Sequence, residues 1–138
     1  MQFRNPLRGP NHKDEPRWPD MCNCYDEKLK LLAEEVAREQ GISLRRGTLG
    51  AVMGPNYETA AEAAMLNKLG ADAGCMSTVP EVITAAACGL RVLGISCITN
   101  SAAGISDIKL THEDVQRVAA ETSARFASLL SGIPKRIS

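Results

Sequence analysis

The 138-residue sequence has little of what identifies several common classes of functional site. Aromatic residues make up only 4% of it, and histidine occurs twice. Sixteen basic and sixteen acidic residues give a formal net charge of zero, so the chain lacks the basic surplus that attracts nucleic acid. No apolar run is long enough to span a bilayer, and no apolar leader follows Met1. We therefore expect a soluble, cytoplasmic protein that binds neither nucleic acid nor a membrane.

Patterns typical of metal ligands and of covalent nucleophiles are also missing. The five cysteines are an odd number, and Cys22-x-Cys24 has the spacing of neither a redox motif nor a zinc site. Cys75, Cys88 and Cys97 stand in apolar contexts that suit buried free thiols. We expect no metal ion and no cofactor. The sequence also contains no Ser-His-Asp arrangement and no glycine-rich phosphate loop.

Hydrophobic residues, by contrast, make up 44% of the chain, which is enough for one domain with an aliphatic core. Helical spacing of apolar residues, capping residues and glycine stops predict the helices, and short apolar runs predict the strands. The last strand is continuously apolar, as in parallel strands that are covered on both faces. In chain order, the predicted elements are a helix over 26–40, a strand over 48–53, a helix over 58–69, a strand over 72–76, a helix over 78–88, a strand over 91–98 and a helix from 111 to 132.

This alternation predicts an α/β protein with a mostly parallel sheet and flanking helices. Three strands make a thin sheet, however, and its central strands would need helices on both faces. The chain is therefore expected to form part of a larger sheet, as a partial three-layer αβα fold.

Residues 1–25 contain four prolines and little apolar periodicity, which predicts an extended arm outside the domain over 26–138. The arm carries the chain's one tryptophan, Trp18. The interpretation that we favour is a packing anchor that ties the arm down. The alternative is an aromatic residue lent to a site on this or a neighbouring subunit.

The stretch Met53-Gly54-Pro55-Asn56-Tyr57-Glu58-Thr59 indicates where the site lies. Thr59 and Glu62 have the spacing of a capping box, which places the residues before them where a strand becomes a helix. In open parallel sheets, ligands bind at the carboxyl ends of the strands. A second capping box is predicted from Thr78 to Glu81. The residues expected at this edge of the sheet are Tyr57, Glu58, Met76, Ser77, Thr99 and Asn100.

Taken singly, the candidate residues have ordinary structural explanations. Glu58 suits the positive end of a helix dipole, and Asn100 suits a turn. Ser77 would serve as an N-cap, Met76 as a core residue and His112 as a surface residue in a first helical turn. Only the ordered set favours a site.

That ordered set resembles the trimeric purine nucleoside phosphorylases. The segments that carry the resemblance are NPLRGPN, GPNYETAAE, LGADAGCMSTVPEVI and LRVLGISCITN. It runs from Asn5 to about Pro134 and matches only the C-terminal half of a typical member, so 26–138 would be half of a nucleoside phosphorylase domain. The resemblance implies a transferase of purine salvage that cleaves inosine or guanosine with phosphate to the free base and ribose 1-phosphate.

The resemblance also implies roles for individual residues. Glu58 would accept hydrogen bonds from N1–H and the 2-amino group of a 6-oxopurine, and Asn100 would bond O6 and N7; these two are the implied catalytic residues. Tyr57 would pack on sugar and base, and Met76 would lie under the ribose. Ser77 would contribute to phosphate binding.

Three further residues complete the implied substrate site. Thr99 precedes Asn100 at the same edge, and His112 would meet the 5′-hydroxyl. Trp18 would reach the neighbouring subunit's ribose site across a trimer interface. The implied partners are a purine nucleoside or base, phosphate, and either identical subunits in a trimer or a separate N-terminal half.

The residue types suit this chemistry. A purine leaves readily only if the charge arriving on its ring is stabilised, and an amide held near N7 does this. A fixed carboxylate selects a ring with N–H donors over adenine, whose N1 is an acceptor.

Two departures from the family pattern bear on activity. Cys75 stands where the family usually has the glycine that lies beside the base, and Ala85-Ala86-Ala87 replaces a polar Ala-Arg-His. The family's glycine-rich phosphate loop belongs to the half that is not matched. The alternative to an enzyme half is therefore a non-catalytic purine-binding remnant or a split subunit that needs a partner chain, and a weaker one is an oligomerisation module without a ligand. The isolated chain is expected to be inactive.

Overall fold

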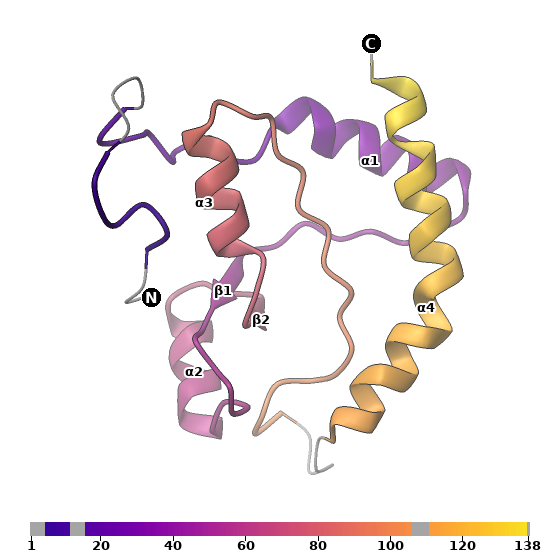
Figure 1. The fold of residues 1–138 in the computed structure, drawn as a ribbon. Coiled ribbons are helices and arrows are strands. Elements are labelled where there is room, and N and C mark those ends of the chain that lie inside the picture. Colours follow the sequence, from indigo (N-terminus) through magenta and orange to yellow (C-terminus); the bar gives the residue numbers. More distant parts are fainter. Residues whose placement is uncertain (1–4, 12–15, 106–110, 138) are drawn as a thin grey trace.

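Most of the predicted helices and strands are present in the computed structural model, which describes residues 5–11, 16–105 and 111–137. Residues 1–4 and 12–15 of the predicted arm and residues 106–110 of the loop over 101–110 therefore lie outside the described residues. Figure 1 shows the arrangement, an α/β fold with a parallel sheet and flanking helices. The described elements are α1 Glu27–Glu39, β1 Leu49–Ala51, α2 Ala60–Lys68, β2 Ala73–Cys75, α3 Val79–Ala87, α4 His112–Gly132 and the 3₁₀ helix η1 Pro134–Arg136.

Three of the helices begin at capping residues that the sequence itself provides. The Asp26 side chain accepts from the Leu29 amide at 3.0 Å and begins α1. At α2, both halves of the predicted capping box form: the Thr59 hydroxyl accepts from the Glu62 amide, and the Glu62 carboxylate accepts from the Thr59 amide at 2.8 Å. Thr111 caps α4 in the same way as Asp26 caps α1. Each cap satisfies amides that a helix leaves without partners.

The second predicted capping box is wrong. Thr78 has φ +71° and its side chain makes no capping hydrogen bond. An N-cap side chain reaches the helix amides only from an extended backbone, so this conformation removes the cap. Pro80 instead begins α3 within its first turn, where its missing N–H costs nothing.

The sheet consists of two parallel strands in the described part of the chain, with Leu49 opposite Ala73 and Ala51 opposite Cys75. Gly50 faces Gly74 in the middle of the ladder. A Cβ at Gly50 would lie 3.2 Å from Leu66 Cδ2 and 3.0 Å from Ala71 Cβ. Glycine at this position therefore lets α2 pack closely on the sheet.

The predicted third strand is not observed. Residues 92–98 form no helix or strand, and in Figure 1 this part of the chain runs between α3 and α4. Among the described residues, none forms a backbone hydrogen bond with residues 93–98. A run of apolar residues indicates burial, but a strand also requires hydrogen bonds to a neighbouring strand.

Besides Ala51 of β1, Leu66 of α2 and Val82 of α3, which are also buried, a core cluster lies between α1 and α4. Its buried residues are Ala33, Val36, Ala37, Leu129 and Ile133, with Leu93 and Ile95 packed against them. Gly132 permits this contact, because a Cβ there would lie 2.7 Å from Val36 Cγ1. The 3₁₀ helix adds an ion pair between Arg136 and Glu39. This cluster and the ion pair hold α1 against α4 and η1.

Two predictions about side-chain burial are wrong. Trp18 is 86% exposed, and its ring lies 5.5 Å from the Arg17 guanidinium instead of packing on the domain. Cys88 and Cys97 are exposed, and Cys75 is half-buried. The described residues do not provide the second layer that would cover these side chains. None of the described helices is long and apolar enough to cross a membrane.

Candidate functional site

The edge where β1 and β2 end brings two of the predicted segments into contact. After β1 the chain turns through Gly54, with φ +60° and a cis peptide bond to Pro55. A Cβ at Gly54 would lie 2.6 Å from Met76 Sδ. The Met76 thioether therefore packs against this turn, and the close approach and the positive φ both favour glycine at position 54.

The loop after Asn100 reaches the same region. A Cβ at Gly104 would lie 2.8 Å from Ala60 Cβ, which is in the first residue of α2. Tyr57 and Glu58 immediately precede this helix. The segments over 54–60, 76–77 and 100–104, which are distant in sequence, are thus gathered at one edge of the fold.

The carboxylate at this edge has no internal partner. Glu58 is half-buried, and no hydrogen bond or ion pair joins it to another described residue. The neighbouring Tyr57 ring is 44% exposed. Both side chains are therefore open to a ligand.

Asn100, in contrast, is held by its neighbours. The Thr99 hydroxyl donates to Asn100 Oδ1 at 2.7 Å, and Asn100 Nδ2 donates to the Ser101 carbonyl at 3.0 Å. These two bonds set the orientation of the amide. One N–H of the Nδ2 group remains for a further acceptor.

Ser77 lies in a tight and strained turn. Its carbonyl accepts from the Val79 amide at 2.7 Å, which makes Thr78, with φ +71° and ψ −53°, the centre of a γ-turn. The same carbonyl accepts from Cys75 Sγ at 3.1 Å. A β-branched residue with positive φ is a genuine outlier, and such strain gathers at functional sites. Sequence reasoning missed this turn, since nothing in Ser-Thr-Val signals it.

The turn presents two hydroxyls at the start of α3. Ser77 Oγ and Thr78 Oγ1 are 3.4 Å apart. The first amides of a helix and its dipole favour an anion at this end.

Two predicted residues stand apart from this group. His112 is the exposed first residue of α4, and its Nε2 lies 3.2 Å from Nε2 of Gln116 on the same helix. Trp18 lies on the arm, with its ring contact to Arg17. Neither is brought to the other site residues by a contact within the described part of the chain.

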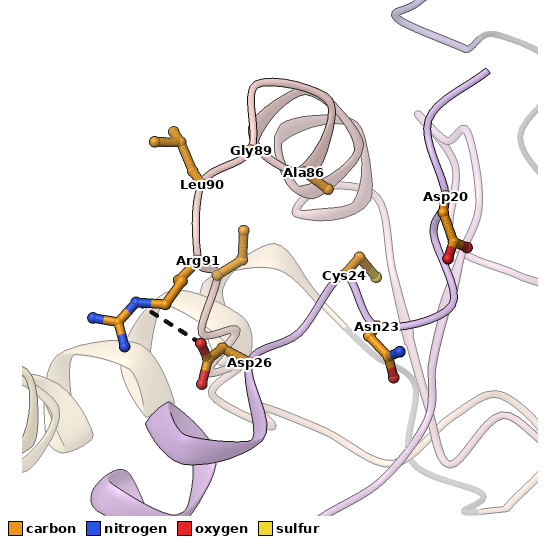
Figure 2. A pocket seen from close by; sticks show the side chains of 9 residues that line it. Asp20, Asn23, Cys24, Asp26, Ala86, Gly89, Leu90 and Arg91 are labelled. Carbon is orange, nitrogen blue, oxygen red and sulfur yellow. Dashed lines mark ion pairs between the residues drawn. The ribbon is translucent and has the colours of Figure 1, made fainter. Parts of the chain in front are cut away.

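A pocket of about 210 Å³ lies elsewhere, between the end of the arm and the end of α3 (Figure 2). In it, Arg91 Nε lies 3.8 Å from the Asp26 carboxylate that caps α1. Sequence reasoning did not find this pocket, and it includes none of the predicted site residues. Its lining residues are Asp20, Asn23, Cys24, Asp26, Ala86, Gly89, Leu90, Arg91 and Val92. Across the described residues, no group of three or more His, Cys, Asp or Glu side chains is placed to hold a metal ion.

Comparison with known sequences relates nearly all of the chain to one superfamily. A family model described as the phosphorylase superfamily matches residues 1–134. Purine nucleoside phosphorylase 1 of Bacillus subtilis is 50% identical over 130 residues, which cover 94% of this chain and 48% of that protein. The Mus musculus purine nucleoside phosphorylase is 44% identical over 137 residues, which cover 92% and 47%. The chain thus spans about half the length of the curated relatives that it matches.

Comparison with solved structures gives the same relationship. A Schistosoma purine nucleoside phosphorylase in complex with hypoxanthine superposes with a TM-score of 0.91 at 36% identity, covering 96% of this chain and 49% of that one. The Schistosoma mansoni enzyme in complex with inosine gives 0.90 at 37% identity. These matches confirm the predicted resemblance and the partial αβα fold.

Proposed function

The chain belongs to the phosphorylase superfamily, and we propose that it supplies the base- and ribose-recognition half of a purine nucleoside phosphorylase. The reaction is the phosphate-dependent cleavage of inosine or guanosine to the free base and ribose 1-phosphate. The proposal rests on two close approaches, of Gly54 to Met76 and of Gly104 to Ala60. Together they bring the predicted site segments over 54–60, 76–77 and 100–104 to one edge of the fold. The proposed reaction is the one that the names of the similar proteins, purine nucleoside phosphorylases, describe.

Glu58 recognises the base in this proposal. A half-buried carboxylate without an internal partner gains most from two N–H donors, which a 6-oxopurine offers at N1–H and, in guanine, at the 2-amino group. Adenine would place a ring acceptor opposite the charge. Leaving a polar group unpaired in this way costs about 1–3 kcal/mol.

Asn100 acts on the leaving base. Its amide is already oriented by Thr99 and Ser101, so little reorganisation is needed when charge develops at N7 and O6. Thr99 therefore contributes to the substrate site through Asn100.

The remaining residues bind the sugar and the phosphate. Tyr57 packs on sugar and base, and Met76 lies under the ribose. Ser77, at the start of α3, contributes a hydroxyl to phosphate. His112 meets the 5′-hydroxyl. The 86% exposure of Trp18 leaves its ring available to a neighbouring subunit, in a cytoplasmic homotrimer.

Calorimetry of base binding tests this function. Hypoxanthine, guanine and adenine are titrated into the full chain, with and without phosphate. We expect the two 6-oxopurines to bind and adenine to bind more weakly. Equal affinities for guanine and adenine, or no binding of any base, would contradict the proposal.

The alternative is a purine-binding remnant without catalysis. It is supported by the scarcity of phosphate donors at the site, where Ser77 and one helix end are the plausible anchors. The two functions share base binding and differ in phosphorolysis. Release of hypoxanthine from inosine in the presence of a complementary half separates them.

A further inference from the structure

The thiol of Cys75 is bonded to the backbone of the turn that carries Ser77. Cys75 is the last residue of β2 and lies opposite Ala51, and its Sγ donates to the Ser77 carbonyl at 3.1 Å. The same carbonyl accepts from the Val79 amide at 2.7 Å. A carbonyl oxygen has two lone pairs, so these two donors occupy both of them and fix the direction of the carbonyl.

The Cys75 side chain lies on the face of β2 that is turned away from α2. Gly74, one residue earlier, is on the α2 side, because a Cβ there would lie 3.8 Å from Leu66 Cδ1. Successive side chains of a strand point to opposite faces. The thiol is therefore outside the contact between the sheet and α2 and is available to the turn.

The fixed Ser77 carbonyl also sets the direction of the amide that follows it. A trans peptide is planar, so the Thr78 N–H points opposite to the Ser77 carbonyl. No described residue accepts a hydrogen bond from this N–H. It is therefore a donor without a described partner at the start of α3, in the residue next to Ser77.

The conformation of this turn is unfavourable and has to be imposed by its surroundings. Thr78 has φ +71° and ψ −53°, which a β-branched residue adopts only where other contacts offset the strain. The Val79 amide belongs to the turn itself, whereas the Cys75 thiol reaches it from the strand. Cys75 thus ties the strained turn to the end of β2.

We propose that Cys75 is a positioning residue for phosphate. Its thiol holds the Ser77 carbonyl, so that the Ser77 hydroxyl and the Thr78 amide keep the direction in which they bind the anion. The proposal rests on the proposed function, which assigns Ser77 to phosphate. It also gives a role to a departure from the family pattern, because a glycine at this position has no side-chain donor.

The conformation of the turn is measured without any ligand. Carbon chemical shifts depend on φ and ψ, and those of Thr78 are recorded by NMR on the full chain labelled at threonine, with Thr78→Ser to assign them. We expect Cys75→Ala to move these shifts from left-handed toward extended values and Cys75→Ser, which keeps a donor, to leave them unchanged. Unchanged shifts in Cys75→Ala would overturn the proposal, since the turn would then form without the thiol.

Phosphate binding is the functional readout. Inorganic phosphate and hypoxanthine are titrated separately into the full chain by calorimetry. We expect Cys75→Ala to weaken phosphate binding about fivefold, the contribution of one hydrogen bond, and hypoxanthine binding by less than about twofold. Cys75→Ser should bind both ligands as the unsubstituted chain does. Equal weakening of both ligands in Cys75→Ala would indicate a general structural role and would contradict the proposal.

Cys88→Ala is the matched control. Cys88 is an exposed cysteine at the other end of α3, and its substitution should change neither the Thr78 shifts nor the two affinities.

The thiol itself gives a measurement that does not depend on the folding of Cys75→Ala. In infrared spectra, the S–H stretching band that is lost in Cys75→Ser belongs to Cys75. We expect this band at a lower frequency than that of a free thiol, because the S–H group donates a hydrogen bond. A free-thiol frequency would overturn the proposal.

Two outcomes separate this inference from the proposed function. A turn that relaxes in Cys75→Ala, in a chain that binds neither phosphate nor hypoxanthine, would refute the proposed function and the phosphate role together and leave Cys75 as the residue that holds the turn. Unchanged affinities for both ligands in Cys75→Ala would refute the inference and leave the proposed function in place.

Discussion

At the scale of single residues, most groups of the candidate site are held by hydrogen bonds to neighbouring residues, whereas the Glu58 carboxylate is not. Asn100 is fixed by Thr99 and Ser101, and the Ser77 carbonyl is held by Val79 and Cys75. Glu58 has no hydrogen bond or ion pair to a described residue. Under the proposed function, a bound base would therefore change the surroundings of Glu58 most.

Replacing Glu58 with glutamine should reduce discrimination between bases. The amide keeps the shape of the side chain but removes the charge and one acceptor, so we expect guanine to bind about tenfold more weakly and adenine to change little, because charged hydrogen bonds contribute more than neutral ones. Calorimetry measures both affinities. Glu35→Gln, on the exposed surface of α1, is the matched control and should change neither.

Replacing Thr78 with glycine should stabilise the fold. Glycine adopts φ near +71° without strain, and relief of that strain, less the extra freedom of the unfolded chain, amounts to about 1 kcal/mol. The measurement is the urea midpoint of helical circular dichroism. Thr84→Gly, inside α3, carries the same substitution and should destabilise by about 0.3 kcal/mol, because threonine is itself a poor helix former. A lower midpoint for Thr78→Gly would show that the turn is not strained.

At the scale of secondary-structure elements, the N-terminal ends of α2 and α3 position the candidate site residues. The capping box of α2 sets where the helix begins, and Tyr57 and Glu58 immediately precede its cap. The γ-turn at Thr78 does the same for Ser77 and α3. Both ends belong to short helices that have few internal hydrogen bonds, so their caps matter more than they would in a long helix.

The capping box should make α2 sensitive to acid. Hydrogen bonds from the Thr59 amide and hydroxyl lower the pKa of Glu62 below its ordinary value of 4.5. A lowered folded-state pKa contributes stability that is present above pH 4.5 and is lost as the pH falls through the folded value. We expect the urea midpoint to fall as the pH drops below 4.5, and Glu62→Gln to remove part of that fall.

Thr59→Ala removes the other half of the box and should cost about 1 kcal/mol at neutral pH. Glu35→Gln again serves as the control and should leave the pH dependence unchanged. A pH profile of Glu62→Gln identical to that of the unsubstituted chain would contradict the assigned role.

At the scale of the whole molecule, the chain buries little apolar surface and exposes much of it. Its buried residues are a small cluster between α1 and α4 and a few others, Leu29, Ala51, Leu66 and Val82. Contiguous exposed apolar surface marks an interaction site. The large exposed hydrophobic side chains include Met53, Met65, Leu69, Leu90, Ile98 and Ile105.

The isolated chain should therefore self-associate or aggregate. Its open strand edges and uncovered apolar face favour association over a stable monomer. Sedimentation velocity across a range of concentrations measures this. A compact monomer with a sharp, cooperative melt would refute the expectation.

The isolated chain should also show no detectable phosphorolysis. Phosphate must be oriented beside the anomeric carbon, and correct positioning accounts for about 7–11 kcal/mol of a barrier. Ser77 and the start of α3 cannot orient it alone. The assay is hypoxanthine release from inosine with phosphate at high protein concentration. Turnover above the buffer rate that disappears in Asn100→Ala would contradict this, with Asn67→Ala on α2 as the control.

Local sequence patterns determined the helices, the first two strands and the family. Caps such as Asp26 and Thr59 act within a few residues of themselves, so their effect can be read along the chain. Tertiary structure alone decided that 93–98 lacks a paired neighbour, that Thr78 takes a left-handed conformation and that Trp18 is exposed. It also brought the three site segments to one edge. Pairing, strain and burial depend on groups far away in sequence, and no local pattern records whether those groups are present.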